Sequence, residues 1–440
     1  MPLVIVFIGI LFLLLLMSVF KLNAFFSLLI TAFFVGLLNS MGLNETIDSI
    51  LNGIGDTMGS LVLLLTFGAM LGKLIEESGA ALSITYRLKK IFGEKYIQLA
   101  FVITGFLVGI PMIYNASFLV LVPLLYTFAT TSKKSLLYLG IPMSASLSVA
   151  HAYLPPHPAP TAVSMIYGAD INLSLLYGLI PCIPAIVLAG PVLSRFFNKW
   201  YITPPAGMFS AKEYDEKDLP GVGVSVFTIL TPVVLMVVGA LFPMLTGERV
   251  SATVLEVAAF LSNPNIALFI AVMVGIYTLG IRRGRRMTDI MKTLERAAES
   301  IFIVVIIIAA GGALKQVLFD SGVADYIKEV VQDFHFNPII MAWVVAALLR
   351  LAIGSATVAT ITAAGIMHPV VVASGVSPEL MVLATGSGSL MFSHFNDVGF
   401  WMFKEYYNVS VKQTFQVWTV MESIVGIVGL ITVLIIHAMA

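Results

Sequence analysis

Charged residues are scarce in this sequence, and cysteine is almost absent. Asp, Glu, Lys and Arg make up 11% of the 440 residues, whereas soluble domains average about 25%. The 24 basic and 24 acidic residues cancel, and a net charge of zero gives no indication of nucleic-acid binding. The one cysteine, Cys182, excludes an intramolecular disulfide bond. The first 20 residues lack the basic region and cleavage site of a signal peptide, so we interpret them as a membrane span.

Long apolar segments are abundant instead, since 59% of the residues are hydrophobic. Nearly uncharged segments of about 17 or more residues recur along the chain, and each is long enough to cross the membrane as a helix. The alternating pattern of a transmembrane barrel is absent from the sequence. The sequence therefore predicts an all-α polytopic membrane protein. The predicted spans are 3–20, 22–40, 58–76, 97–128, 136–171, 173–195, 222–243, 265–281, 300–318, 338–372, 378–411 and 414–438.

Basic segments indicate which loops face the cytoplasm, because Lys and Arg concentrate on that side of the membrane. The strongest are "IRRGRRM" (Ile281–Met287) and "YRLKKIFGEK" (Tyr86–Lys95). Placing both segments inside the cell puts both termini in the periplasm. It also makes segments 97–128 and 338–372 re-entrant hairpins, which enter and leave the membrane on the same face. The sequence therefore predicts ten crossings and two hairpins.

Two pairs of segments resemble each other at the same spacing along the chain. "GAMLGKLIEESG" (68–79) resembles "GGALKQVLFDSG" (311–322), and "SASLSVAH" (144–151) resembles "SGSLMFSH" (387–394). Both pairs are offset by 243 residues, which indicates an internal repeat.

The charges of equivalent loops indicate how the two repeats are oriented. The loop after Gly79 is strongly basic, whereas the loop after Gly322 is mainly acidic, so the two loops are expected on opposite sides of the membrane. Inverted-topology repeats of this kind are typical of secondary transporters. We assign residues 1–195 to the first inverted repeat, 196–220 to a cytoplasmic linker and 221–440 to the second repeat. Each repeat is predicted to contain one re-entrant hairpin and one broken transmembrane helix.

Four predicted helix breaks lie at the depth of the membrane. Two are hairpin tips, "VGIPMIYNAS" (Val108–Ser117) and "LAIGSATVAT" (Leu351–Thr360), and two interrupt crossings, at 151–160 and at Ser393–Phe400. Non-helical backbone is tolerated at this depth only where protein or a water-filled cavity satisfies its polar groups. The half-helices that begin at such breaks direct free N–H groups and partial positive charge toward the gap. The sequence therefore predicts a central site for an anion such as a carboxylate.

Ionisable side chains at the breaks are candidates for carrying a coupling proton. Asp397 is the carboxylate that we place at midplane depth, where a charged residue costs roughly 2.5–3.5 kcal/mol on insertion scales. His394 and His151 occupy equivalent positions of the repeat, and a histidine can exchange a proton near neutral pH. The alternatives are structural pairing for Asp397 and capping of a broken helix for each histidine. We expect Glu422, in the last span, to make an interhelical hydrogen bond.

Short polar side chains at the breaks are candidates for binding a solute, with capping of a half-helix as the alternative role. His157 lies between prolines, whose fixed backbone geometry favours a contact with a ligand. No metal site and no cofactor is predicted. The substrate-binding candidates are Asn115, Ser117, His157, Gly354, Ser355, Thr357 and Asn396.

Three motifs resemble the gluconate permease family of bacterial proton symporters. They are "LPPHPAPTAV" (Leu154–Val163), "GSATVATITAAG" (Gly354–Gly365) and "SHFNDVGFWMFKEYYNVSVKQT" (Ser393–Thr414). The resemblance implies uptake of gluconate or related sugar acids across the inner membrane, driven by protons. It also implies the fold of the ion-transporter superfamily, whose members dimerise through scaffold helices and move a transport domain like an elevator.

The sequence thus predicts a symporter that imports a small sugar acid with a proton. Its expected partners are the carboxylate substrate, protons, membrane lipid and a second copy of the chain. The alternatives are a symporter for D-serine or other small amino or hydroxy acids, and a sodium-coupled carboxylate symporter. An intramembrane hydrolase is disfavoured because the chain lacks H-E-x-x-H and G-x-S-x-G motifs. It also lacks the phosphate-binding loop of an ATP-driven pump, and paired inverted breaks suit alternating access better than a channel.

Overall fold

The structure is a computed structural model of the chain, and its regular secondary structure is helical throughout the residues it describes. By length and composition, six of the helices within this part of the chain are long and apolar enough to cross a membrane, or seven if the two halves of a bent helix count as one span. Shorter apolar helices of 10–17 residues accompany them. The described residues are 2–93, 95–197, 199–203, 218–246, 250–322, 337–394 and 397–439.

The helices of residues 2–196 are α1 (Pro2–Ser18), α2 (Ala24–Leu38), α3 (Leu43–Ser78), α4 (Ala80–Phe92), α5 (Ile97–Gly109), α6 (Tyr114–Ser132), α7 (Leu136–Tyr153), α8 (Pro158–Tyr167), α9 (Ile171–Val187), η1 (Leu188–Val192) and α10 (Leu193–Phe196). Those of residues 222–439 are α11 (Val222–Thr246), α12 (Ala252–Ser262), α13 (Pro264–Gly275), η4 (Ile276–Gly280), η5 (Ile281–Arg283), α14 (Met287–Asp320), α16 (Pro338–Ile353), α17 (Ala356–Ser374), α18 (Pro378–Gly388), α19 (Val398–Tyr406), α20 (Val411–Thr414), η6 (Phe415–Thr419) and α21 (Val420–Met439).

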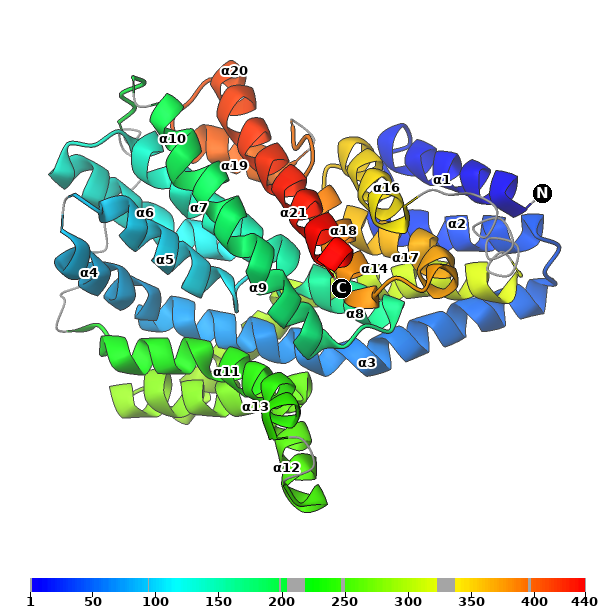
Figure 1. Ribbon diagram of the computed structural model, residues 1–440, viewed down its shortest axis with the longest axis horizontal. Coiled ribbons are helices and arrows are strands. Elements are labelled where there is room, and N and C mark those ends of the chain that lie inside the picture. Colours follow the sequence, from blue (N-terminus) through cyan, green and yellow to red (C-terminus); the bar gives the residue numbers. More distant parts are fainter. Residues whose placement is uncertain are drawn as a thin grey trace.

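Helices α3 and α14 form a long antiparallel pair, and α3 runs along the long axis of the molecule (Figure 1). At one end, the Ser49 hydroxyl donates a hydrogen bond of 2.7 Å to the Asp320 carboxylate. At the other end, Arg285 forms an ion pair of 2.9 Å with Glu77. The backbones come close in between, because a Cβ atom on Gly53 would lie 2.5 Å from the carbonyl oxygen of Gly312. The pair is therefore held by polar contacts near both ends and by close backbone packing between them.

Each predicted hairpin segment is a pair of helices joined by a short turn. The chain leaves α5 at Gly109 and enters α6 at Tyr114, and Pro111 lies in the turn, where it cannot continue the helix. Helix α16 ends at Gly354, whose φ of +85° is accessible to glycine without strain. Ser355 then caps α17 by accepting a hydrogen bond from the Val358 N–H. Both breaks therefore lie within the predicted tips.

The two predicted broken crossings are also interrupted where proline and polar residues indicated. Helix α7 ends before Pro155 and Pro156, and α8 begins at Pro158. Helix α18 ends at Gly388, and Asp397 is the N-cap of α19. All residues of α7 except two are buried, so this broken helix lies inside the protein, where neighbouring helices cover its polar groups. Cys182 of α9 is buried as well, and its thiol donates to the Gly178 carbonyl.

The structure corrects several predicted boundaries. The segment after Gly79, predicted as a basic loop, forms helix α4, which buries residues 80–85 and places Lys89 and Lys90 in its last turn. Cations at that end interact favourably with the helix dipole. The predicted spans 58–76 and 300–318 extend at their N-terminal ends into the full α3 and α14, and α12 was not predicted. These missed parts carry polar residues or are short, so hydropathy over a span-sized window does not detect them.

The helices pack in groups around the α3–α14 pair. Helices α11 and α13 lie on one side of α3, and α12 projects outward from them (Figure 1). The opposite side carries α5, α7, α9, α16 and α21, with α1 and α2 beside α14 and α16. The broken helices α7 and α18 contact one another near the centre of this larger group. The ends of these broken helices therefore meet inside the protein.

Candidate functional site

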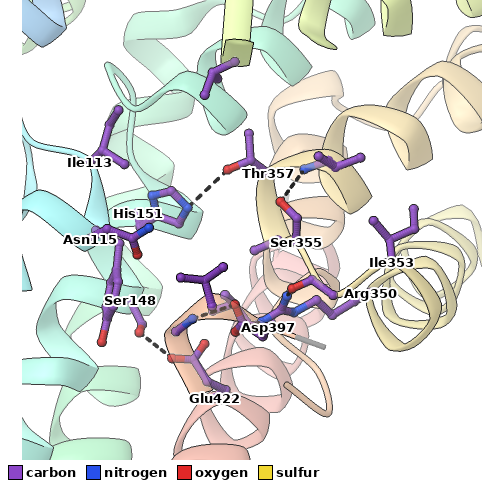
Figure 2. Close-up of a pocket in the computed structure, with 18 of the residues that line it drawn as sticks. Ile113, Asn115, Ser148, His151, Arg350, Ile353, Ser355, Thr357, Asp397 and Glu422 are labelled. Carbon is purple, nitrogen blue, oxygen red and sulfur yellow. Dashed lines mark hydrogen bonds and ion pairs between the residues drawn. The ribbon is translucent and has the colours of Figure 1, made fainter. Parts of the chain in front are cut away.

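Three of the four helix breaks open onto one cavity of about 360 Å³ (Figure 2). The turn before α6, the turn before α17 and the segment that leads into α19 all line it, together with residues of α7, α14, η6 and α21. Its volume lies within the usual range of small-molecule pockets, about 300–1,000 Å³. The fourth break, before α8, lines a separate cavity of about 20 Å³. The apolar lining of the main cavity includes Ile113, Ile303, Val304, Ile307, Ile353, Val358, Leu390 and Val398.

A buried ion pair lies in the wall of the main cavity (Figure 2). Arg350, in the last turn of α16, directs Nη2 to the carboxylate of Asp397 and Nη1 to the carbonyl oxygen of Gly354. Its side chain is 2% exposed, and its buried Nε atom has no hydrogen-bond partner among the described residues. A buried cation is strongly unfavourable unless it is paired. Asp397 therefore supplies the negative charge that this buried guanidinium requires.

Asp397 also organises the start of α19. Its Oδ1 atom accepts a hydrogen bond of 2.9 Å from the backbone N–H of Gly399, as expected of an N-cap. Its Oδ2 atom accepts a bond of 2.5 Å from the Ser393 hydroxyl. The Trp418 indole N–H donates in turn to the oxygen of Ser393, at 2.7 Å. The carboxylate thus lies at the end of a hydrogen-bonded chain that joins η6 to α19.

Glu422 is a second buried carboxyl group in the cavity wall. It is 2% exposed, and it accepts a hydrogen bond of 2.5 Å from Ser148 of α7. This contact confirms the predicted interhelical hydrogen bond. Within the part of the chain that the structure describes, no Lys, Arg or His side chain lies at ion-pair distance from its carboxyl oxygens. Glu422 and Asp397 therefore differ in their partners, because only Asp397 contacts a cation.

His151 separates the main cavity from the break before α8. Its Nε2 atom lies 3.4 Å from the Thr357 hydroxyl across the cavity, and its Nδ1 atom lies 3.3 Å from Nδ1 of His157. His157 is buried behind it, and its Nε2 atom contacts the carbonyl oxygen of Gly109. The repeat-related His394 lies elsewhere, with Nε2 3.1 Å from the carbonyl oxygen of Leu351.

The structure brings together six of the ten residues that the sequence singled out. Ser117 is buried away from the cavity, and its hydroxyl donates to the carbonyl oxygens of Met112 and Ile113 in the turn before α6. His157 lines the smaller cavity, and His394 lines neither of these cavities. Asn396 lies outside the described residues. The candidates that line the main cavity are Asn115, His151, Gly354, Ser355, Thr357 and Asp397.

Arg350 is the lining residue that the sequence analysis missed. The signal was present, because Arg350 is the one Lys, Arg, Asp or Glu residue in the predicted segment 338–372. A charged residue inside an apolar segment indicates a functional site by default. Its partner Asp397 is 47 residues further along the chain, a contact that no local pattern predicts.

The arrangement suits an anionic solute that carries hydroxyl groups. A guanidinium and the N-terminal turns of α6, α17 and α19 surround the space, and Asn115, Ser148, His151 and Thr357 add neutral polar groups. The sequence profile of the GntP family permease matches residues 1–439. The chain belongs to the GntP permease family.

Relatives of this permease are transporters by name. It is 47% identical to the high-affinity gluconate transporter of Escherichia coli K12, over 99% of both chains. It is 45% identical to the Gnt-II system L-idonate transporter of the same organism, over 100% of this chain and 99% of that one. The permease is therefore a multi-pass membrane transporter and not an enzyme.

Solved structures of two transporters share the fold of the permease. The YdaH transporter of Alcanivorax borkumensis matches with a TM-score of 0.66 and 15% identity, over 90% of both chains. MtrF of Neisseria gonorrhoeae matches with a TM-score of 0.63 and 15% identity, over 89% of this chain and 84% of that one. At this level of identity the likeness concerns the fold alone.

Proposed function

We propose that this permease imports gluconate or a related small sugar acid, together with a proton, across the bacterial inner membrane. The observation that carries the proposal is a cavity that combines a buried guanidinium with three helix N-termini and several neutral polar groups. A carboxylate suits the first two features, and sugar hydroxyls suit the third. The names of the relatives, which include gluconate and L-idonate transporters, support this substrate class.

The roles of the lining residues follow from their positions. Arg350 and the N-terminal turn of α17, which Ser355 caps, line the same side of the cavity. Their positive charge makes this side the most favourable place for the carboxylate of the substrate. Asn115 and His151 lie across the cavity from this turn, and Thr357 within the turn faces His151, so all three are within reach of the hydroxyl groups of the same solute (Figure 2). Asp397 is our first candidate for carrying the coupling proton, because its carboxylate lines the cavity and forms an ion pair with Arg350.

We also propose that residues 1–195 and 221–440 are inverted repeats. The bounds of several helices recur at the spacing of 243 residues. Shifting α3 by this amount gives 286–321, close to α14, and shifting α6 gives 357–375, close to α17. Because α3 and α14 are antiparallel, equivalent helices run in opposite directions, which supports an inverted relation. Helix α11 precedes this pattern and has no equivalent in the first repeat.

Helix lengths and contacts support the proposed topology. The first arms of the two hairpins, α5 with 13 residues and α16 with 16, measure about 20 and 24 Å, less than the roughly 30 Å of the hydrocarbon core, whereas the second arms, α6 and α17, have 19 residues each. This supports re-entrant hairpins. The end of the linker lies beside the basic segments, since Arg283 donates to the Asp218 carbonyl and Ser83 donates to the Pro220 carbonyl. This supports a cytoplasmic linker. The homodimer and the elevator-like movement stay predictions of the family resemblance.

Uptake by reconstituted vesicles tests the function and its coupling. One proton and one monoanion together move no net charge, so an inward pH gradient is expected to drive gluconate accumulation and a membrane voltage alone is not. A zwitterion such as D-serine taken up with one proton moves one charge, worth about 2.3 kcal/mol per 100 mV.

The same vesicles distinguish the alternatives. Replacing sodium with potassium is expected to leave gluconate uptake unchanged, and a requirement for sodium would establish the sodium-coupled alternative instead. Accumulation of gluconate under voltage alone would contradict one-to-one proton coupling.

A further inference from the structure

We propose that Arg350 binds the carboxylate of the transported sugar acid and that Asp397 occupies the guanidinium when the site is empty. In this exchange, a proton that arrives at Asp397 releases Arg350 for the incoming carboxylate. The inference rests on the proposed function, and it adds a reason why substrate and proton bind together.

The geometry of Arg350 supports its role as the carboxylate site. The guanidinium carries five N–H donors in a planar fork that matches a carboxylate. Nη2 is directed to Asp397 and Nη1 to the Gly354 carbonyl, and the buried Nε has no hydrogen-bond partner in the part of the chain that the structure describes. The side chain lines the main cavity directly beside the N-terminal turn of α17 (Figure 2). A solute carboxylate at this position would meet both the guanidinium and free backbone N–H groups.

The carboxylate of Asp397 and the carboxylate of the substrate compete for the guanidinium of Arg350. Asp397 contacts the guanidinium through Oδ2, so a second carboxylate bound to Arg350 would lie close to the first one. Like charges that share a site disfavour each other's ionised form. Protonation of Asp397 removes this repulsion and frees Nη2. The arrival of one anion and one proton then leaves the total charge of the cavity unchanged.

The surroundings of Asp397 accommodate its protonated form in place. The Ser393 oxygen accepts a hydrogen bond from the Trp418 indole and keeps a second lone pair. When the Ser393 hydroxyl rotates its hydrogen away, this oxygen can accept the proton of a neutral Asp397. Oδ1 still accepts from the Gly399 N–H. The hydrogen-bonded chain therefore persists in both protonation states.

Other ionisable groups face the same space, and among the described residues only Asp397 competes for the guanidinium. Glu422 enters from α21, and its partner is the Ser148 hydroxyl. His151 enters from α7, where it contacts Thr357 and His157, and Tyr114 enters from α6. A change in the protonation of any of these three groups would not release Arg350. Glu422, to which we assign no contact with the substrate, is therefore the comparison group for the test.

Calorimetry of gluconate binding tests the exchange on the purified, full-length protein in detergent. Titrations in buffers of different ionisation enthalpy give the number of protons taken up per bound gluconate. The wild-type protein is expected to take up close to one proton, and its affinity is expected to rise as the pH falls. Asp397→Asn is expected to take up none and to bind gluconate with an affinity independent of pH. Glu422→Gln is expected to take up a proton as the wild type does.

Variants of Arg350 test the carboxylate contact itself. Arg350→Gln removes charge-assisted hydrogen bonds, and Arg350→Lys removes the fork while keeping the charge, so gluconate affinity is expected to fall by about 10–100-fold. Binding of gluconate with wild-type affinity by Arg350→Gln would overturn the inference. Proton uptake that persists in Asp397→Asn, or that disappears in Glu422→Gln instead, would also overturn it.

The wild-type titration keeps the test decisive if a variant fails to fold. Gluconate binding without any proton uptake by the wild-type protein overturns the exchange by itself, while leaving a gluconate transporter in place. Absence of gluconate binding by the wild type overturns the proposed substrate as well. In Asp397→Asn, bound gluconate replaces the missing anion, so it is expected to raise the melting temperature more than it does in the wild type.

Discussion

Gly354 illustrates how one residue can fix both the backbone and the charge of the site. Its φ of +85° ends α16, and its N–H donates to the Arg350 carbonyl at 3.0 Å. Its own carbonyl oxygen accepts a hydrogen bond from Arg350 Nη1. The turn therefore orients the guanidinium as well as starting α17. Any side chain at this position strains the turn and displaces an acceptor of the buried cation.

Gly354→Ala is expected to weaken gluconate binding and stability together. The left-handed conformation costs about 1–2 kcal/mol for a residue with a Cβ atom. Displacement of the carbonyl oxygen should lower gluconate affinity by about tenfold, the value of one hydrogen bond to a charged group. Uptake kinetics and melting temperature measure the two effects.

Gly375→Ala is the matched control for this variant. Gly375 has a φ of +68° at the end of α17, and a Cβ atom there would meet no atom of the described residues within 4 Å. The Gly375→Ala variant should lose a similar amount of stability without a change in its affinity for gluconate. Equal losses of affinity in both variants would show that strain, and not the position of Arg350, determines binding.

At the scale of elements, the interrupted helices could be predicted and the long helices only partly. Pro155, Pro156 and Gly354 disfavour continued helix through local backbone geometry, so the breaks are visible in the sequence. The N-terminal half of α3 carries Glu45, Asp48 and Asp56, which hide it from a search for apolar spans. Its stability comes from packing against α14, a contact between segments more than 200 residues apart.

The site could be predicted in outline because it lies at helix breaks, which local sequence features indicate. Helix breaks and polar residues near them are local features, and they indicated Asn115, Ser355 and Asp397. Which way a side chain points depends on packing, so the sequence could not place His157 behind His151, nor pair Arg350 with Asp397. Motifs identify the breaks, and the tertiary fold decides which of their residues line one space.

Gly53→Ala tests the close packing of α3 on α14. The added Cβ atom would lie 2.5 Å from the Gly312 carbonyl oxygen and 2.8 Å from Ala313 Cα, and backbone atoms cannot move aside easily. Overpacking of this kind typically costs about 1–3 kcal/mol. The melting temperature of the purified protein is expected to fall.

Gly55→Ala provides a control on the same helix. Within the part of the chain that the structure describes, a Cβ atom on Gly55 would meet no neighbouring atom within 4 Å. Alanine is the better helix former by up to about 1 kcal/mol, so this variant is expected to be neutral or stabilising. A similar fall in melting temperature in Gly53→Ala and Gly55→Ala would argue against close contact between α3 and α14.

At the scale of the whole molecule, the proposed topology assigns a side of the membrane to every exposed segment. The structure groups the basic residues around Arg283 with the end of the linker. Helix α12 projects from the opposite end of α11 and α13 (Figure 1). Inverted repeats with both termini outside place the first group in the cytoplasm and α12 in the periplasm.

Cysteine labelling in cells tests this assignment. Glu256 of α12 and Arg286 are exposed, and the native Cys182 is buried, so an introduced cysteine is expected to react first. Glu256→Cys should react with a membrane-impermeant maleimide in intact cells, and Arg286→Cys only after the membrane is opened. The reverse pattern would invert the proposed orientation.

The ion pair between Arg350 and Asp397 has a further consequence for the transport cycle. After each release of substrate, the empty carrier of a symporter must return to its outward-facing state. An unpaired guanidinium would make this conformational change very unfavourable in a low-dielectric interior. A built-in counter-ion leaves the unloaded carrier as neutral at this position as the loaded one. In the mechanism that we propose, the empty carrier therefore returns readily to its outward-facing state. In a carrier without Asp397, this return step would limit the turnover.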